Sequence, residues 1–258
     1  MSIQELGIPT ADIAVIFGKH ERQLLDTLRY DRFRVTETPG QWELLLGPDV
    51  VLLTHPKVVA QIAEDFVSYE GVTLTDEEQT LFSTAPWIHD LGELIIESDG
   101  IGDVSFDQKT DAHEKKEILI FDAVLNAIPN SATKRLIKRA YQDVVIDRHS
   151  ELGRMFNVVE RIGYLLTAVR AYKGVDGNRI QNWKGLVGNV LSNQIIPLLN
   201  YASEFAYVSY VLFEDNRQAI NSMFEETHSE APPDRTGNPS FDPEKLRQAL
   251  LAWQDMLK

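Results

Sequence analysis

The sequence contains no cysteine among its 258 residues. The chain therefore cannot form disulfides, bind metal through thiolates or use a cysteine nucleophile. Histidine, aspartate and glutamate remain as the strong metal ligands, so any bound metal must be held by nitrogen and oxygen atoms.

Positive charge is also scarce. The chain has 25 Lys and Arg residues against 39 Asp and Glu residues, which gives a formal net charge of -14. Binding to a nucleic acid polymer or to an anionic membrane requires a concentrated positive field, so we expect neither as a partner. A small phosphorylated substrate is compatible with this charge, because a local cluster of Lys, Arg or a metal ion can overcome the global sign.

Long apolar runs are missing as well. No stretch approaches the roughly 18 uninterrupted apolar residues that a membrane-spanning helix needs. The N-terminal segment lacks the basic start and the apolar block of a signal peptide. We therefore expect a soluble protein of the cytoplasm.

Alternating, strand-like runs are nearly absent, whereas apolar residues recur at spacings of three and four almost everywhere. This pattern predicts an all-α fold, in which residues 42–46 are the one candidate for a short strand. Thr75 and Glu78 have the spacing of a capping box, which predicts the start of a helix at Asp76. The expected helices span residues 12–28, 54–69, 76–89, 109–127, 132–145, 151–173, 182–199, 203–226 and 243–258.

Composition suggests three parts along the chain. Residues 1–50 read as an N-terminal helical extension and residues 51–226 as a helical core. Residues 227–258 read as a linker followed by an amphipathic C-terminal helix, because the segment before Pro243 concentrates proline, glycine, serine and charged residues.

The stretch Trp87-Ile-His-Asp-Leu-Gly-Glu93 places a histidine and two carboxylates directly behind an apolar run. Adjacent residues of a regular helix cannot face the same direction, so a metal that uses both His89 and Asp90 needs the helix to end there. Gly92 supplies such a break. A complete site also needs ligands from other helices, and His55, 34 residues before His89, is the upstream candidate.

A histidine at the start of one helix, a His-Asp pair at the end of the next and an acidic residue on a later helix resemble the HD-domain superfamily of metal-dependent phosphohydrolases. The similarity extends through HDLGE, Gly102-Asp103, Lys109 and the HEKKE run that ends at Glu117. This order is similar to that of the bacterial 5'-deoxynucleotidase branch, over residues 50–172.

The resemblance implies an HD-domain helical bundle with additional N- and C-terminal helices. It also implies one divalent ion, which could be Mn, Co, Mg, Fe or Zn, bound by His55, His89, Asp90 and a fourth ligand. Glu160 stands where the family has aspartate, and Asp147 is the alternative. An extra methylene displaces the carboxylate, so the choice between these two residues stays open.

The resemblance and the residue types together assign further roles. Glu93 matches the glutamate that handles the proton of the attacking water, a general-base role that its spacing from His89 also allows. Asp103 matches the aspartate near the same water and phosphate. The cations that follow are candidates for neutralising phosphate charge. The expected substrate-binding residues are Lys109, Lys116 and Glu117.

The expected activity is hydrolysis of a phosphate ester of a small nucleotide, with 5'-deoxynucleoside monophosphates as the leading substrate class. Three alternatives stay open on the same fold. They are a deoxynucleoside triphosphate triphosphohydrolase, a diiron oxygenase that would use His113, and a noncatalytic regulatory module. The sequence does not identify the base, the sugar, the physiological metal, the role of the C-terminal helix or the oligomeric state. A homodimer is compatible with the sequence.

Overall fold

A computed structural model of the protein describes residues 6–94, 110–227 and 231–258. These residues form helices and contain no strand, apart from three isolated bridges such as Leu28 to Val51. The all-α fold class predicted from the sequence is confirmed. No helix in the described ranges is long and apolar enough to cross a membrane.

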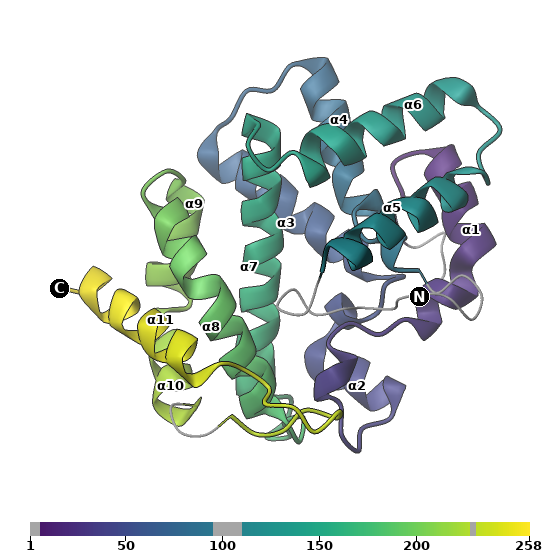
Figure 1. The fold of residues 1–258 in the computed structure, drawn as a ribbon. Helices are drawn as coiled ribbons and strands as arrows, with labels where there is room; N and C mark the ends of the chain where they lie inside the picture. The colour runs from purple at the N-terminus through teal and green to yellow at the C-terminus, as the bar shows by residue number, and fades with distance from the viewer. Residues whose placement is uncertain (1–5, 95–109, 228–230) are drawn as a thin grey trace. The chain divides into compact units, whose positions relative to one another are not determined.

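Figure 1 shows the helices in their order along the chain. Most of them begin and end within a few residues of the predicted bounds. Their bounds are α1 Ala11–Asp26, α2 Pro39–Leu46, α3 His55–Glu70, α4 Asp76–Ile88, α5 Asp111–Leu125, α6 Ser131–Ala140, α7 Glu151–Lys173, α8 Trp183–Ala202, α9 Ala206–Ser209, α10 Arg217–Thr227 and α11 Pro243–Met256. Shorter turns are the 3₁₀ turns η2 Asp31–Phe33, η3 Pro48–Val50 and η4 Leu91–Glu93, and the π-helical turns η7 Tyr141–Ile146 and η8 Tyr210–Asp215.

The expected strand at residues 42–46 is wrong, since these residues belong to α2. Pro39 occupies the first turn of α2, and Thr38 and Gln41 form a capping box that fixes its start. Trp42 and Leu46, four residues apart, are buried on one face, whereas Leu44 is 64% exposed. Burial at helical spacing together with a strong cap therefore outweighs the local preference for a strand.

The chain divides into two compact units. The described part of the first unit comprises residues 6–29, 49–65, 72–94 and 110–159, and that of the second comprises residues 30–48, 66–71, 160–227 and 231–258. Helices α3 and α7 contribute residues to both units. The three-part division expected from composition stays a prediction.

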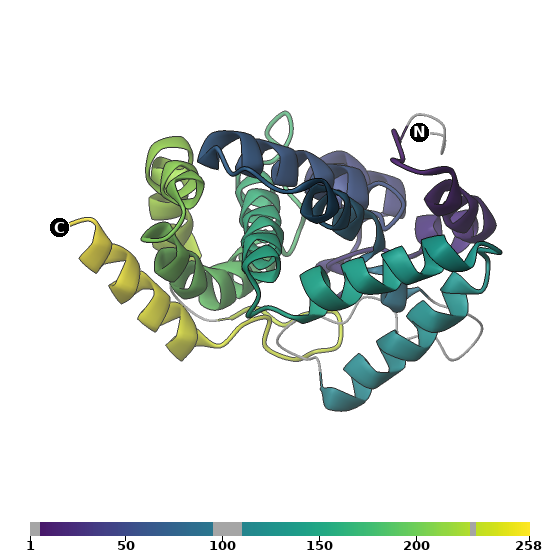
Figure 2. The same cartoon turned by 90° about the horizontal axis from the view of Figure 1, so that it is seen from above.

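In the first unit, α4 packs against α6 and the π-helical turn η7, and α5 packs against η4. Residues 126–130 join α5 to α6 by a short connection (Figure 2). Aromatic side chains fill the core, where Phe17 meets Trp87 edge to face at 6.0 Å and Phe82 meets Phe156 at 6.4 Å between ring centroids. These contacts fix the end of α4, which carries His89.

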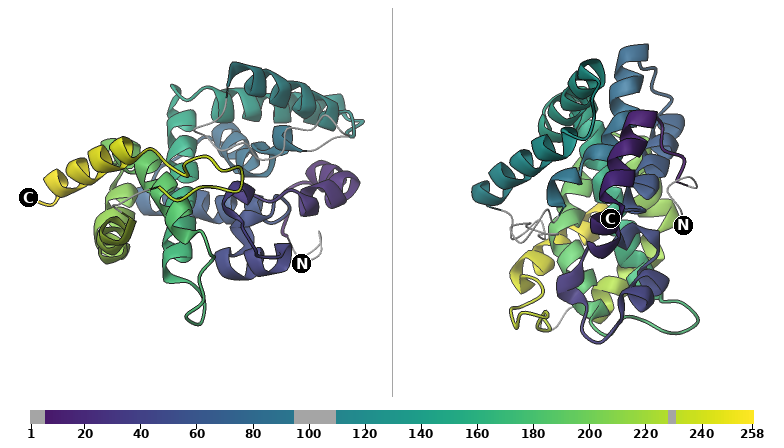
Figure 3. Two further views of the ribbon diagram at one scale, coloured as in Figure 1. Left: turned by 60° about the horizontal axis from the view of Figure 1, so that its bottom comes forward. Right: turned by 90° about the vertical axis from the view of Figure 1, so that its right-hand side faces the viewer.

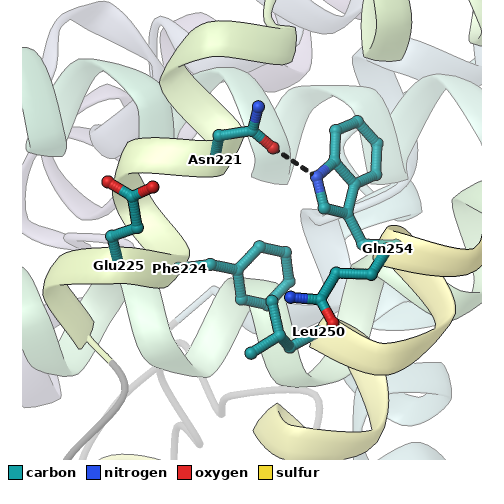
Figure 4. A pocket seen from close by; sticks show the side chains of 6 residues that line it. Asn221, Phe224, Glu225, Leu250 and Gln254 are labelled. Carbon is teal, nitrogen blue, oxygen red and sulfur yellow. Dashed lines mark hydrogen bonds between the residues drawn. The ribbon is translucent and has the colours of Figure 1, made fainter. Parts of the chain in front are cut away.

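In the second unit, α8 packs against both α10 and α11 (Figures 1 and 3). A glycine permits close approach here, because a Cβ atom at Gly188 would lie 2.3 Å from the ring of Phe241. Trp253 of α11 donates a hydrogen bond from its indole Nε1 to the Oδ1 atom of Asn221 on α10 at 2.7 Å (Figure 4). Phe224 and Leu250 line the pocket of about 370 Å³ beside this bond.

Residues 231–242, which lead into α11, are hydrogen-bonded within the second unit. The side chain of Asp234 is fully buried, accepts from the amide of Thr236 at 2.8 Å and lies 3.8 Å from the Nε atom of Arg32. Arg32 also donates to the carbonyl oxygen of Ser240 at 2.7 Å. Although this segment is rich in proline, glycine and serine, it forms a loop that hydrogen bonds connect to Arg32 of the same unit.

Candidate metal centre

Three potential metal-ligating atoms converge in the first unit. The Nε2 atoms of His55 and His89 lie 2.9 Å apart, and the Oδ2 atom of Asp90 lies 3.2 Å and 3.3 Å from them, respectively. The three side chains are 3%, 2% and 16% exposed. Within the described residues, these three side chains could together hold a metal ion, and we call them the His-His-Asp cluster.

His55 is the first residue of α3, and its amide donates to the carbonyl oxygen of Val51 at 2.8 Å. Pro56 in the first helical turn favours this start. The imidazole of His55 therefore stands at the first turn of α3.

The His-Asp pair lies where α4 ends. His89 is the C-terminal cap of α4, and Asp90 follows with φ -98° and ψ 7°, outside regular helix, before the η4 turn. The change of direction between the two residues brings both side chains to one point. A break in the helix at this pair, inferred from the sequence, is present in the structure.

A backbone carbonyl fixes the orientation of the His89 ring. The Nδ1 atom of His89 lies 2.9 Å from the carbonyl oxygen of Pro86. This carbonyl belongs to the last turn of α4, where carbonyl groups have no amide partner in the following turn. A carbonyl can only accept, so Nδ1 carries the proton and Nε2 presents a lone pair to the cluster.

Two charged side chains flank the outer nitrogen of His55. Its Nδ1 atom lies 2.7 Å from the Oδ1 atom of Asp49 and 2.7 Å from the Nη1 atom of Arg29. The guanidinium also lies 3.4 Å from Asp49 Oδ2 and, through Nε, 3.6 Å from Asp90 Oδ2. His55, Asp49 and Arg29 are buried, and the side chain of Asp90 is 16% exposed. A proton on Nδ1 would be donated to Asp49 and would leave Nε2 as the ligating atom.

Pairing between two distant segments places Arg29 and Asp49 together. The amide of Arg29 donates to the carbonyl oxygen of Val50 at 2.8 Å, next to the bridge between Leu28 and Val51. Sequence reasoning did not identify Arg29 or Asp49 as part of the site. The apolar run from Val50 to Leu53 directly before His55 indicates in the sequence that this stretch lies in the core, and the structure buries it.

The electrostatics of the cluster suit a cation. The two Nε2 atoms and the Oδ2 atom of Asp90 converge on one point, where their lone pairs repel one another unless a proton or a metal cation lies among them. Burial opposes ionisation of Asp90, but His89, His55 and Arg29 outweigh it and hold the pKa of this carboxyl well below its usual range. Two imidazoles and an ionised carboxylate fit a divalent metal that prefers nitrogen and oxygen.

A second carboxylate lies on the turn after Asp90. Glu93 is 5% exposed, and its amide donates to the Asp90 carbonyl oxygen at 2.9 Å. Helix α5 packs directly on this turn at Gly92, where a Cβ atom would lie 2.7 Å from the carbonyl oxygen of Glu117. Glu117 is also buried, at 8% exposure. The structure therefore brings the predicted residues Glu93 and Glu117 onto two segments in direct contact.

The other predicted site residues lie elsewhere or are not described. Lys116 is half-buried on α5, whereas Asp103 and Lys109 fall outside the described residues. Glu160 is half-buried on α7, in the second unit, and stays a predicted ligand. Asp147, the alternative fourth ligand, is exposed and accepts from the amide of His149 at 3.1 Å.

His113, which a diiron site would use, belongs to the capping box of α5. Its Nδ1 atom accepts from the amide of Thr110 at 3.2 Å. The imidazole is therefore engaged at the helix start, and the His-His-Asp cluster does not include it.

Comparison with known proteins gives no match: no family model, no curated protein and no solved structure is significantly similar to this chain.

Proposed function

We propose that this protein is an HD-domain metal-dependent phosphohydrolase that acts on small nucleotides, with 5'-deoxynucleoside monophosphates as the first substrate class. The observation that carries the proposal is the convergence of His55 Nε2, His89 Nε2 and Asp90 Oδ2 in a buried cluster within 3.3 Å of one another. The Nδ1 atom of each ring lies beside an acceptor, Asp49 for His55 and the Pro86 carbonyl oxygen for His89. These contacts favour the ring orientations that metal binding requires.

His55, His89 and Asp90 would hold the metal ion, and the fourth ligand, Glu160 or Asp147, stays a prediction from the sequence. Such an ion, when bound, lowers the pKa of a coordinated water and polarises a phosphoryl oxygen. For an octahedral ion such as Mn²⁺ or Mg²⁺, two imidazoles and two carboxylates leave positions open for water and substrate.

Glu93 would act as the general base that accepts the proton of the attacking water. Its carboxylate lies on the turn that begins at Asp90, and the hydrogen bond from its amide to the Asp90 carbonyl ties the two residues together. Contact with α5 at Gly92 keeps this turn in place. Lys116, on the same helix as Glu117, would neutralise phosphate charge.

The charge of the whole chain supports a small substrate. A net charge of -14 repels a polyanion along its length, whereas one phosphate group interacts mainly with the metal and the nearby cations. The proposal therefore places nucleotides, and not nucleic acid polymers, as substrates.

The test is phosphate release from a panel of nucleoside mono-, di- and triphosphates, with Mn²⁺, Co²⁺ or Mg²⁺ added to metal-stripped protein. We expect metal-dependent release of inorganic phosphate from monophosphates. In the Glu93→Gln variant, turnover should fall by about 10²- to 10⁴-fold while the metal content stays the same. Glu225→Gln, an exposed glutamate of α10, is the matched control and should keep full activity.

The panel also separates the alternatives. Release of inorganic triphosphate from deoxynucleoside triphosphates would identify the triphosphohydrolase instead. No turnover from any nucleotide, in a protein that binds metal, would overturn the hydrolase proposal in favour of a noncatalytic metal-binding module.

A further inference from the structure

We propose that Asp49 is the positioning residue that holds His55 as an Nε2 ligand, and that Arg29 ties Asp49 to the ligand Asp90. This inference rests on the proposed metal-dependent function and adds two residues that control the metal affinity of the site. Neither residue belongs to the His-His-Asp cluster itself.

The contact between Asp49 and His55 has the geometry of a strong hydrogen bond. Asp49 Oδ1 lies 2.7 Å from His55 Nδ1, and the two side chains are 8% and 3% exposed. A carboxylate that accepts from Nδ1 fixes the tautomer and the rotation of the ring and makes Nε2 a better electron donor. Water competes little for this bond because both partners are buried.

Because of Arg29, the side chain at position 49 decides which ring nitrogen of His55 carries the proton. The Nη1 atom of Arg29 lies 2.7 Å from the same Nδ1 atom of His55, so a donor, Arg29, and an acceptor, Asp49, compete for this nitrogen. A guanidinium can only donate. Without the Asp49 carboxylate, Arg29 would donate to Nδ1 and shift the ring to the tautomer that carries its proton on Nε2. That tautomer cannot bind a metal through Nε2, so loss of Asp49 converts Arg29 from a support into a competitor.

In the intact site, the charge of Arg29 stabilises both carboxylates. Its guanidinium lies 3.4 Å from Asp49 Oδ2 and 3.6 Å from Asp90 Oδ2. Burial of two carboxylates in one place requires a compensating cation. Arg29 supplies it to the ligand and to the positioning residue together, which prepares the site before a metal arrives.

The experiment is a titration of the metal-stripped, full-length protein with Co²⁺, followed by the absorption of the bound ion. We expect Asp49→Asn to weaken binding by about 10- to 100-fold. The matched control is Asp234→Asn, which removes an equally buried aspartate that pairs with Arg32 in the second unit and should leave Co²⁺ affinity unchanged. Thermal unfolding of each metal-free variant measures the purely structural effect.

The outcomes separate this inference from the proposed function. Absence of Co²⁺ binding by the wild-type protein would remove the metal site, and the proposed function with it. Wild-type affinity in Asp49→Asn, or an equal loss in both variants, would overturn the role of Asp49 and leave the metal site standing.

A second measurement requires no variant. Long-range ¹H–¹⁵N correlation spectra of the metal-free wild-type protein report the tautomer of each histidine ring. We expect the proton of His55 on Nδ1. A proton on Nε2 in the wild-type protein would contradict the proposal even if no Asp49 variant folds.

Discussion

The Nε2 atoms of His55 and His89 lie 2.9 Å apart, although the residues are 34 positions apart in the chain. One begins α3 and the other caps α4, so the contact depends on how two helix ends meet. The rings also lie 4.9 Å apart between centroids, and that of His89 rests edge-on against Phe156 at 5.5 Å. The imidazoles are therefore held by ring contacts within the first unit as well as by the helices that carry them.

His89→Ala should weaken Co²⁺ or Mn²⁺ binding by at least about 100-fold, because it deletes a direct ligand. Mutation of residues that only hydrogen-bond to a ligand already lowers metal affinity by about 10- to 100-fold. Isothermal titration calorimetry on metal-stripped protein measures this effect. His149→Ala, which changes an exposed histidine of the same unit, is the control and should bind as the wild type does. Equal affinity of the two variants would refute a metal site at His89.

The fourth ligand can be assigned by two matched substitutions. We expect Glu160→Gln to weaken metal binding by about 10-fold or more, as expected for loss of a charged ligand. Asp147→Asn should have no effect, since Asp147 is exposed and its carboxylate accepts from the His149 amide. The same calorimetric titration decides between them, and the reverse pattern would transfer the ligand role to Asp147.

Gly92→Ala should destabilise the protein by about 1–3 kcal/mol, the usual cost of forcing extra volume into a packed site. The added Cβ would lie 2.7 Å from the carbonyl oxygen of Glu117, so α5 or the η4 turn must move. Because Glu93 lies on that turn, turnover should fall together with the melting temperature. Gly18→Ala is a suitable control, since its Cβ meets nothing within 4 Å, and unchanged stability in Gly92→Ala would disprove the close packing of α5 on η4.

Stability should decrease as the pH falls below about 6.5, partly because of His20. Burial, followed by the charge of Lys19, lowers the pKa of His20 below its ordinary value of 6.5. Neither ring nitrogen has a hydrogen-bond partner within the described ranges. The unfolded chain therefore binds the proton more readily than the folded one, so protonation favours unfolding as the pH falls from 6.5 through the folded-state pKa.

Urea denaturation between pH 8 and pH 5 tests this effect. His20→Phe keeps an aromatic ring at the position and removes the titration, so its unfolding free energy should fall less over this range than that of the wild type. An identical pH dependence in the two proteins would exclude His20 as a cause.

Local signals in the sequence were sufficient to predict much of the fold. Thr75 and Glu78 predict the start of α4, and both bonds of the expected capping box are present. The helical class follows from apolar spacing alone. The expectation of a strand at residues 42–46 failed, because the cap at Thr38 lies outside the window in which Trp42 to Leu46 look strand-like.

The candidate site was predictable only in part. His55, His89 and Asp90 could be found because their residue types and helix positions are visible in the sequence, and the structure brings them together. Arg29 and Asp49 could not, because they meet through the pairing of Leu28 with Val51, a contact between segments whose spacing has no periodic signal.

The two histidines differ in how they are anchored. The partner of His89 Nδ1 is the main-chain oxygen of Pro86, which every amino acid possesses, whereas the partner of His55 Nδ1 is the side chain of Asp49. No single substitution at position 86 deletes the group that orients His89, but one nucleotide change can remove the group that orients His55. Mutational robustness of this centre is therefore uneven, and spontaneous loss-of-function variants should accumulate at Asp49 more often than at Pro86.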